Sequence, residues 1–526
     1  MSLLLVGTVA RESATKPAVK SLRRAPLTAA ASLRNRCYLA GYECDSLCEP
    51  VTAFGPARLR QFTAARAALL VLGSTAVSVL SVLLFRTELV NDPNVWLIWS
   101  HDLVHGGVIH AFGGQSTAWK PLPTLVLVPF QLIGGGAAAF AWAVIARASV
   151  LVVSVLLFRS AARVGGAFGG LVAAVCPFLF LSWVRGVSGG MIEPMAVALL
   201  LAAVEANSSG RRRWAFWFGV SACLVRPEIA PIPGLYVLWL LRREGAGVLR
   251  HLAAALLLLL VAWPGLMWLL LDDPIQIVHR AQGWPHASKW ILPLAADAVS
   301  NPIELLGLVA LAALGLAVAL RNREPVVLGA AAVGGGWLAI VGLMGLTGSP
   351  AVPRYVLGGL VVLCVLVGAG AGACVSAAPN RAVALVGFVL AIAAVAWPVA
   401  QRAERIGNIA RAGNRLHLAV EGAAAAINAA GGVGRLEPCF PIGGNRDLSR
   451  PWPYGVLARR LGLSGGTTLP QLTAPTVLVI GPPGEAGGRP THIPGERGRQ
   501  LIVRRDGWSV VYVAGRRDCG AFSLAG

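Results

Sequence analysis

Long apolar segments separated by short polar connections dominate the chain from residue 64 onward. An α-helix needs roughly 20 apolar residues to cross a bilayer core about 30 Å thick. The pattern therefore predicts an all-α polytopic membrane helix bundle of about eleven spans, give or take two. The expected spans are 64–85, 137–158, 164–184, 190–205, 213–225, 229–241, 251–271, 302–320, 327–346, 354–376 and 382–399. The short ones between 190 and 241 are expected inside the bundle, where neighbouring helices can satisfy broken backbone.

Composition supports this interpretation and excludes a water-soluble protein. Of the 526 residues, 56% are hydrophobic, and the mean hydropathy is +0.68, more than a solvated surface can accommodate. Residues 1–30 lack the order of a cleavable secretory signal, so the first span is expected to be an uncleaved anchor. Residues 1–63 are basic and have no long apolar run. We expect them to form a cytoplasmic, mostly disordered tail.

The net charge of +21 predicts orientation rather than nucleic-acid binding. In a membrane protein, basic residues hold loops on the cytoplasmic side and meet anionic lipid, and no basic and aromatic stripe typical of nucleic-acid binding is present. Alternate connections carry arginines and are expected in the cytoplasm. These arginines are Arg159, Arg163, Arg211, Arg212, Arg213, Arg242, Arg243, Arg250, Arg321, Arg323 and Arg381.

The remaining connections are then expected outside the plasma membrane, with most of the acidic, His and Trp residues that lie outside the tails. They are 86–136, 185–189, 226–228, 272–301 and 347–353. Within the first of them, 120–136 is broken by proline and glycine, so we expect it to lie along the interface or to re-enter.

By the same alternation, residues 401–526 follow the transmembrane domain (64–400) as a small extracytoplasmic α/β domain. It should begin with an amphipathic helix over 404–430, and its strands are expected at 476–480, 501–504 and 509–514. An Asp-Gly turn predicts that the last two form a hairpin. Cys439 and Cys519 are the two cysteines of this region, and an oxidising exterior would allow a disulfide between them.

The polar loop from Glu88 to Lys120 concentrates chemistry in a chain where only 13% of residues are charged. It holds Asp92, Asp102 and three histidines. Two of these histidines are four residues apart, but no glutamate follows as in a zinc-binding HExxH motif, so a zinc site is disfavoured. Ionisable groups near a membrane are costly unless they are paired or wetted, and each is therefore a functional candidate. Arg147, inside the second span, is expected to pair with a carboxylate.

The first external loop and the spans after it resemble the integral-membrane glycosyltransferases of the GT-C superfamily. An acidic residue early in that loop is followed by the amphipathic stretch NVWLIWSHDLVHGG and the proline-rich return WKPLPT. The segments SGGMIEPMAVALLLAA (188–203) and CLVRPEIAPIPGLYVLWL (223–240) are similar to actinobacterial members that act on cell-wall sugars. The paired acidic residues frequent in the superfamily are absent, because Asn91 and Pro93 flank Asp92. The choice of base and any need for a metal therefore stay open.

The resemblance implies transfer of mannose or arabinofuranose from a polyprenyl-phosphate donor to an extracytoplasmic cell-envelope glycan or glycolipid, for cell-wall biogenesis. Such a reaction needs a carboxylate base, for which Asp92 is the candidate, although an aspartate before proline also serves as a helix N-cap. Glu193 either orients the acceptor, shares a divalent cation with Asp92, or is simply a solvated charge at a helix N-terminus.

A phosphate leaving group needs fixed positive charge, and five residues predicted at the outer edge could supply it. The donor phosphate candidates are Arg226, Arg354, His279, Arg280 and Lys120. Arg354 could equally be an interfacial anchor. Asp102, Trp284 and Trp290 are candidates for binding the sugar or the acceptor, since aromatic faces stack on sugar rings; tryptophans at this depth also form interfacial belts.

Two other classes of protein compete with the enzyme. A transporter or lipid flippase would use intramembrane charge and broken helices, but its halves should match as inverted repeats, which the sequence does not show. A non-catalytic membrane protein of envelope assembly would predict that Asp92 and Arg226 are dispensable.

Overall fold

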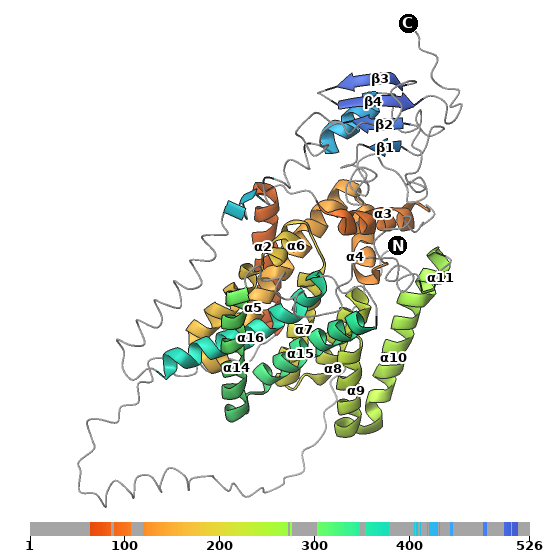
Figure 1. Ribbon diagram of the computed structural model, residues 1–526. Helices are drawn as coiled ribbons and strands as arrows, with labels where there is room; N and C mark the ends of the chain where they lie inside the picture. Colours follow the sequence, from red (N-terminus) through yellow and green to blue (C-terminus); the bar gives the residue numbers. More distant parts are fainter. Residues whose placement is uncertain are drawn as a thin grey trace, which may run out of the picture. The chain divides into compact units, whose positions relative to one another are not determined.

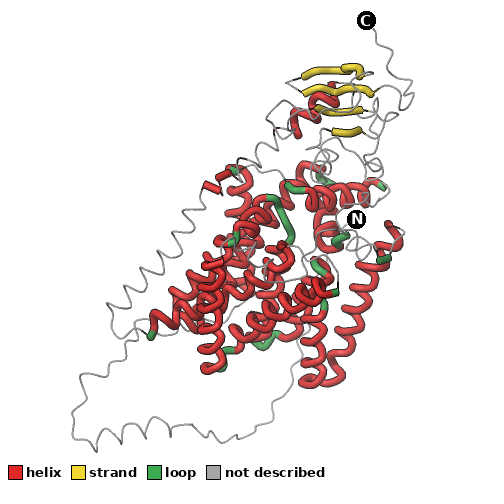
Figure 2. The backbone as a smooth tube through the Cα atoms, in the orientation of Figure 1, coloured by secondary structure: helices red, strands yellow, loops and turns green. Residues whose placement is uncertain are grey.

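A computed structural model gives the structure of the chain (Figure 1). It describes residues 64–85, 89–106, 119–271, 274–275, 302–347, 353–377, 404–405, 407–408, 411, 418, 420–429, 431, 442–444, 477–480, 499–505 and 508–513. Helices make up most of this part, and the strands lie in one sheet near the C-terminus of the chain (Figure 2). The predicted tail 1–63 and the last predicted span, 382–399, lie outside the described residues.

Most of the helices coincide with apolar segments of the sequence, whereas α3 (Asn91–His105) lies in the polar stretch 88–120. The helices are α2 (Ala64–Leu84), α3 (Asn91–His105), α4 (Pro121–Gln131), α5 (Gly135–Val175), α6 (Leu181–Ser188), α7 (Glu193–Ser208), α8 (Arg212–Val225), α9 (Pro231–Glu244), α10 (Leu249–Leu260), α11 (Leu266–Leu271), α14 (Pro302–Asn322), α15 (Pro325–Leu346) and α16 (Pro353–Ser376). Short turns join several of them: η2 (Cys176–Leu179), η3 (Pro227–Ile229), η4 (Gly245–Val248) and the π-helical η5 (Val261–Gly265).

Proline fixes where many of these helices begin. It stands in the first turn of α4, α7, α9, α14, α15 and α16. At the first helical position its missing N–H costs nothing, and its fixed φ suits the helix. The ends of α3 and α9 instead use glycine, because Gly106 and Gly245 take positive φ values of 72° and 67°. The sequence thus marks both the start and the end of several elements.

Helix α5 is a hairpin of two helices rather than one rod. A straight helix of its 41 residues would be about 62 Å long, roughly twice a bilayer core. Gly166 adopts φ 63° and ψ −169° inside it. A Cβ atom placed on Gly170 would lie 2.8 Å from the backbone oxygen of Phe158, twelve positions earlier, so the chain folds back here. The reversal lies just inside the second of the two predicted spans, 137–158 and 164–184, a few residues after the predicted connection.

A second reversal joins α9 to α10 through η4. Buried residues of both helices form one apolar cluster: Val237 and Leu240 from α9 with Val248 and Ala255 from the segment that follows. Helix α9 therefore leads away from η3, and α10 returns beside it (Figure 1). The return ends at η5, where the indole N–H of Trp119 donates to the carbonyl oxygen of Ala262 at 3.0 Å.

The membrane-spanning character of the chain is clear from these helices. Six described helices are long and apolar enough to cross a bilayer, or seven if the bent pair Leu181–Ser188 and Glu193–Ser208 forms one span. Two of the six, Gly135–Leu179 and Pro227–Leu270, contain the reversals just described. The chain is thus a multi-pass membrane protein, while the count of eleven spans stays a prediction. Helix α4 has 11 residues, too few to span, as expected for 120–136.

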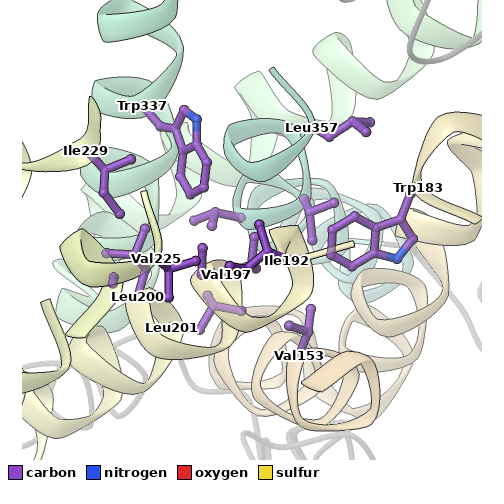
Figure 3. Close-up of a cluster of buried hydrophobic side chains, with 14 of the residues drawn as sticks. Val153, Trp183, Ile192, Val197, Leu200, Leu201, Val225, Ile229, Trp337 and Leu357 are labelled. Atoms are coloured by element: carbon purple, nitrogen blue, oxygen red, sulfur yellow. The ribbon is translucent and has the colours of Figure 1, made fainter. Parts of the chain in front are cut away.

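Helix α16 lies in the centre of the bundle and packs on α5, α14 and α15. Glycines allow close approach: a Cβ on Gly372 would lie 2.1 Å from the backbone oxygen of Gly165, and one on Gly370 would lie 2.0 Å from that of Leu311. Because lipid gives helices no hydrophobic reason to associate, such small residues allow the backbone packing that holds them together. Figure 3 shows the adjoining core, where Ile192, Val197 and Leu201 lie between Trp183 and Trp337.

Arg147 contacts the end of helix α2, and the carboxylate partner expected for it stays a prediction. Its guanidinium donates to the Ser81 hydroxyl at 2.9 Å and to the Phe85 carbonyl oxygen at 2.8 Å. The last carbonyl groups of a helix lack intrahelical donors and carry partial negative charge. Arg147 therefore stabilises the C-terminal end of α2 and fixes that helix against α5.

The C-terminal region contains one four-stranded sheet, in the order β1 (Ile442–Gly444), β2 (Val477–Ile480), β4 (Trp508–Val513) and β3 (Arg499–Arg505). Strands β3 and β4 pair antiparallel, with Arg505 opposite Trp508, which confirms the predicted hairpin. Helical residues occur between 404 and 429, in the range predicted for the amphipathic helix. That the whole region 401–526 forms an extracytoplasmic domain stays a prediction, and Cys439 and Cys519 lie outside the described residues.

Candidate functional site

Asp92 and Arg354 form the first ion pair of the site. Asp92 stands in the first turn of α3, and Arg354 stands in the first turn of α16. A guanidinium nitrogen of Arg354 donates to Oδ2 of Asp92 at 2.9 Å. The N-cap of α3 is Val90, so the aspartate is not the cap that the sequence also allowed. Its carboxylate instead contacts a cation from a distant part of the chain.

The second group of charges surrounds Arg226, at the junction of α8 and η3. Its guanidinium donates to Glu193 through one nitrogen and to Glu228 through the other. Arg226 and Glu193 are almost fully buried, with side-chain exposures of 3% and 5%. Glu193 is therefore not the solvated helix-terminal charge that was one alternative. Buried charges of this kind are tolerated only when they are paired, and removal of one partner is costly.

Backbone contacts bring the two groups together. The N–H of Val90 donates to the carbonyl oxygen of Gly189 at 2.9 Å, which joins the start of α3 to the turn before α7. The buried side chain of Asn94 donates to the carbonyl oxygens of Leu89 and Val90 and holds this entry to α3 in place. Arg354 lies within electrostatic reach of Glu193 as well as Asp92. The four side chains Asp92, Glu193, Arg226 and Arg354 thus form one charged cluster.

Lys120 adds a third cation next to this cluster. It is the N-cap residue of α4, and its ammonium lies 5.6 Å from the centre of the Trp263 ring. Burial lowers the pKa of Lys120 to about 8; the charge of Glu228 opposes this, and those of Arg226 and Arg354 add to it. An ammonium group carries three donors, so Lys120 can donate to an incoming anion.

Tyr355 lies beside both arginines. Its ring centre is 5.0 Å from the Arg226 guanidinium and 5.6 Å from that of Arg354. Its backbone carbonyl accepts from the indole N–H of Trp337 at 2.9 Å, which fixes the start of α16 against α15. An aromatic face attracts cations electrostatically, and this contact helps two like charges to share the cluster.

Several helix N-termini lie at this cluster, because Asp92, Lys120, Glu193 and Arg354 stand at the starts of α3, α4, α7 and α16. The N-terminal end of a helix carries unsatisfied N–H groups and partial positive charge, and it favours anions. Three cationic side chains add to this field, and three carboxylates, those of Asp92, Glu193 and Glu228, balance it. The arrangement can bind a phosphate and offers carboxylates close to it; we call it the charged cluster below.

The opposite ends of the helices carry a separate set of charges. Glu205, twelve residues after Glu193 on α7 and about 18 Å further along its axis, accepts from Arg163 at 2.8 Å and from Arg159 at 3.2 Å. Arg212 at the start of α8 pairs with Glu244 at the end of α9 over 3.1 Å. The charged cluster and these arginines thus lie at opposite ends of the same helices, in agreement with the alternation predicted from the basic connections.

Of the predicted site residues, the structure gathers Asp92, Glu193, Arg226, Arg354 and Lys120 into the charged cluster. Asp102 is almost fully buried on α3, ten residues and about 15 Å along the axis from Asp92, and its predicted role stays a prediction. Four other candidates, His279, Arg280, Trp284 and Trp290, lie outside the described residues, as does any contact they make. The described residues contain no group of three or more metal-ligating side chains placed to hold an ion, and a divalent cation shared by Asp92 and Glu193 stays a prediction.

Glu228, Tyr355 and Trp263 belong to the site but were not predicted for it. Glu228 and Tyr355 stand close in sequence to Arg226 and Arg354, and this adjacency could have identified both. Trp263 had no such signal, because it lies inside an apolar run that reads as an ordinary span. Its indole N–H donates to the carbonyl oxygen of Cys223 at 3.1 Å, which places its ring beside Lys120 through a contact between distant helices.

Comparison with known proteins finds a similar fold over most of the chain. No protein-family model and no curated protein matches it. Among solved structures, it is similar to the crystal structure of ArnT from Cupriavidus metallidurans bound to undecaprenyl phosphate, with a TM-score of 0.50 and 14% identity over 86% of this chain and 99% of that one. The apo structure of the same protein gives a TM-score of 0.47 and 15% identity over 86% and 100% of the two chains. The chain thus has an ArnT-like fold over 86% of its length.

Proposed function

We propose that this chain is a membrane-embedded glycosyltransferase. It takes a sugar from a polyprenyl-phosphate donor and transfers it to an extracytoplasmic glycan or glycolipid acceptor. The observation that carries the proposal is the charged cluster. In it, the ion pair between Asp92 and Arg354 lies near Arg226 and Lys120, where several helices begin. The ArnT-like fold supports it, because undecaprenyl phosphate is bound in the structure with which the chain shares that fold.

The chemistry assigns a role to each side of the cluster. Asp92 accepts the proton of the acceptor hydroxyl, whose oxygen attacks the anomeric carbon of the donor sugar. The bond between that carbon and the phosphate oxygen breaks, and the polyprenyl phosphate leaves with the bonding electrons. Arg354, Arg226 and Lys120 stabilise the negative charge that develops on the phosphate, since fixed cations in a poorly solvated site are effective at this.

The two acidic partners of Arg226 hold this arginine toward the phosphate. In the described part of the chain, Oε2 of Glu193 accepts no hydrogen bond, so we assign this oxygen to the acceptor hydroxyl or to a divalent cation shared with Asp92. The donor sugar is mannose or arabinofuranose, and the shape of the pocket selects between them. The arginine-rich C-terminal region is assigned to the acceptor polymer, and the end of the bundle with the charged cluster is assigned to the exterior.

The test is transfer by an Asp92→Asn variant of the full chain in membranes, assayed with radiolabelled polyprenyl-phosphate mannose and arabinofuranose. Loss of a general base should slow transfer by about 10²- to 10⁴-fold, while the isosteric amide keeps the contact with Arg354. Glu244→Gln, which removes a partly exposed carboxylate at the other end of the bundle, should leave transfer unchanged. Undiminished transfer by Asp92→Asn would rule out the base. A transporter or flippase would instead move the donor across the membrane without releasing polyprenyl phosphate.

A further inference from the structure

The end of α8, α9 and α10 opposite the charged cluster carries an unusual density of arginine. The connections at this end contribute six arginines: Arg211, Arg212, Arg213, Arg242, Arg243 and Arg250. Glu244 is the single acidic residue in the same two connections, 209–213 and 242–250. Five of these arginines are exposed and Arg212 is partly buried. We call this surface the arginine patch.

The patch is built around one indole ring. The guanidinium of Arg243 lies 5.0 Å from the centre of the Trp239 ring, and that of Arg212 lies 5.6 Å from it. Tyr236 stacks on the same tryptophan at 5.4 Å, and its hydroxyl donates to Oδ1 of Asn207 at 2.9 Å. The ring is thus fixed by neighbours from α7, α8 and α9, and the two guanidiniums that lie over it have a defined position.

One carboxylate is shared among these like charges. Glu244 accepts a hydrogen bond from Arg212 at 3.1 Å. Among the described residues, this is the one ion pair that involves an arginine of the patch. Two guanidiniums beside one ring repel each other, and an anion near both of them relieves this repulsion. Trp214, on the same end of α8, is 63% exposed, as is common for tryptophan at the level of lipid headgroups.

From these observations we propose that the arginine patch binds the phosphate headgroup of an anionic phospholipid in the leaflet opposite the charged cluster. The phosphodiester would lie between Arg212 and Arg243 over Trp239, and the acyl chains would follow the apolar faces of α8 and α9. Clusters of four to eight basic residues next to membrane helices recognise anionic lipid in this way, and arginine contacts phosphate oxygens through paired N–H groups. The site is separate from the sugar-transfer chemistry proposed above and does not depend on it.

The experiment uses the full chain purified in an uncharged detergent, with thermal unfolding followed as phosphatidylglycerol or phosphatidylcholine is added. Phosphatidylglycerol should raise the unfolding temperature in a saturable manner, and phosphatidylcholine should have little effect. Arg212→Gln and Arg243→Gln should each weaken the apparent affinity for phosphatidylglycerol about fivefold, since each basic residue contributes about that factor. Arg321→Gln, an exposed arginine on the last turn of α14, is the matched control and should not change it.

Two conservative variants separate binding from folding. Arg243→Lys keeps the charge but not the paired N–H groups, so it should retain part of the affinity. Trp239→Leu should weaken binding while all six charges remain. The proposal is overturned if both lipids stabilise the protein equally, if Arg321→Gln weakens binding as much as Arg243→Gln, or if inorganic phosphate or an acidic peptide stabilises it more effectively than the lipid.

Discussion

The carboxylate of Asp92 and the guanidinium of Arg354 lie 2.9 Å apart although 262 positions separate them in the chain. One stands in the first turn of α3 and the other in the first turn of α16. Their contact, together with Arg226 and Lys120, turns charges dispersed along an apolar sequence into a site that can accept a phosphate.

Arg354 should contribute to donor binding through its paired N–H groups as well as its charge. Arg354→Gln is expected to lower kcat/KM for the polyprenyl-phosphate donor by about 10- to 100-fold, because a hydrogen bond to a charged group contributes roughly 1.5–3 kcal/mol. Arg354→Lys should recover only part of this loss, since an ammonium cannot contact Asp92 and a phosphate in the same planar geometry. Steady-state transfer kinetics with varied donor concentration measure both effects, and equal activity of the three proteins would remove Arg354 from the site.

Transfer should fall as the pH rises through about 8. Burial lowers the pKa of Lys120 to about 8, so at pH 9 about a tenth of the molecules keep the charged form and kcat/KM for the donor should drop up to tenfold. Lys120→Arg should remove this alkaline decrease, because arginine stays protonated. A pH profile of the two proteins provides the measurement, and an identical profile for both would contradict the role of Lys120.

Lys120 should make the folded protein more stable as the pH rises, whereas it should make transfer slower. Its pKa in the folded protein lies below the ordinary value of 10.5, so between about pH 8 and 10.5 the unfolded chain binds more protons at this residue than the folded chain. The free energy of unfolding should therefore gain a favourable contribution from Lys120 as the pH rises through that window. Comparison of denaturation at pH 8 and pH 10 in the native protein and in Lys120→Met isolates this contribution, which should be absent from the variant.

Gly372 should tolerate no side chain. A Cβ atom there would lie 2.1 Å from the backbone oxygen of Gly165, so Gly372→Ala must push α16 away from α5 and should destabilise the protein by about 1–3 kcal/mol. Gly335, on α15, is the matched control because a Cβ there would meet nothing within 4 Å. Thermal unfolding in detergent should show a lowered midpoint for Gly372→Ala and an unchanged or slightly raised one for Gly335→Ala.

Glu205 should matter for stability far more than Glu244. Its side chain is 4% exposed and is shared by Arg159 and Arg163, so Glu205→Gln removes the buried carboxylate that both arginines contact and should cost about 3–5 kcal/mol. Glu244→Gln breaks a pair whose side chains are 34% and 31% exposed, and it should cost less than about 1 kcal/mol. Equal losses of unfolding free energy in the two variants would contradict this assignment.

The positions of most apolar helices were determined by the sequence alone, because a bilayer requires long apolar segments and excludes unsatisfied backbone. Proline in the first turns of α7, α15 and α16, and glycine after α3 and α9, marked boundaries that the structure retains. The basic connections likewise predicted which helix ends lie together, since charge anchors one side of a membrane. Asp92, Glu193, Arg226, Arg354 and Lys120 were identifiable as candidates because ionisable groups are rare and costly in such a chain.

Only the tertiary structure decided which of these charges meet. That Arg226 contacts Glu193 and Glu228, and that Arg354 contacts Asp92, depends on the close packing of α16 against α5 and on the backbone contact between Val90 and Gly189. Trp263 and the partners of Arg147 were equally hidden, because they depend on which faces of distant helices are in contact. Hydrophobic periodicity indicates how much of a helix is buried, but it does not indicate which neighbouring helix buries it. The pairing of buried charges depends on the identity of that neighbour.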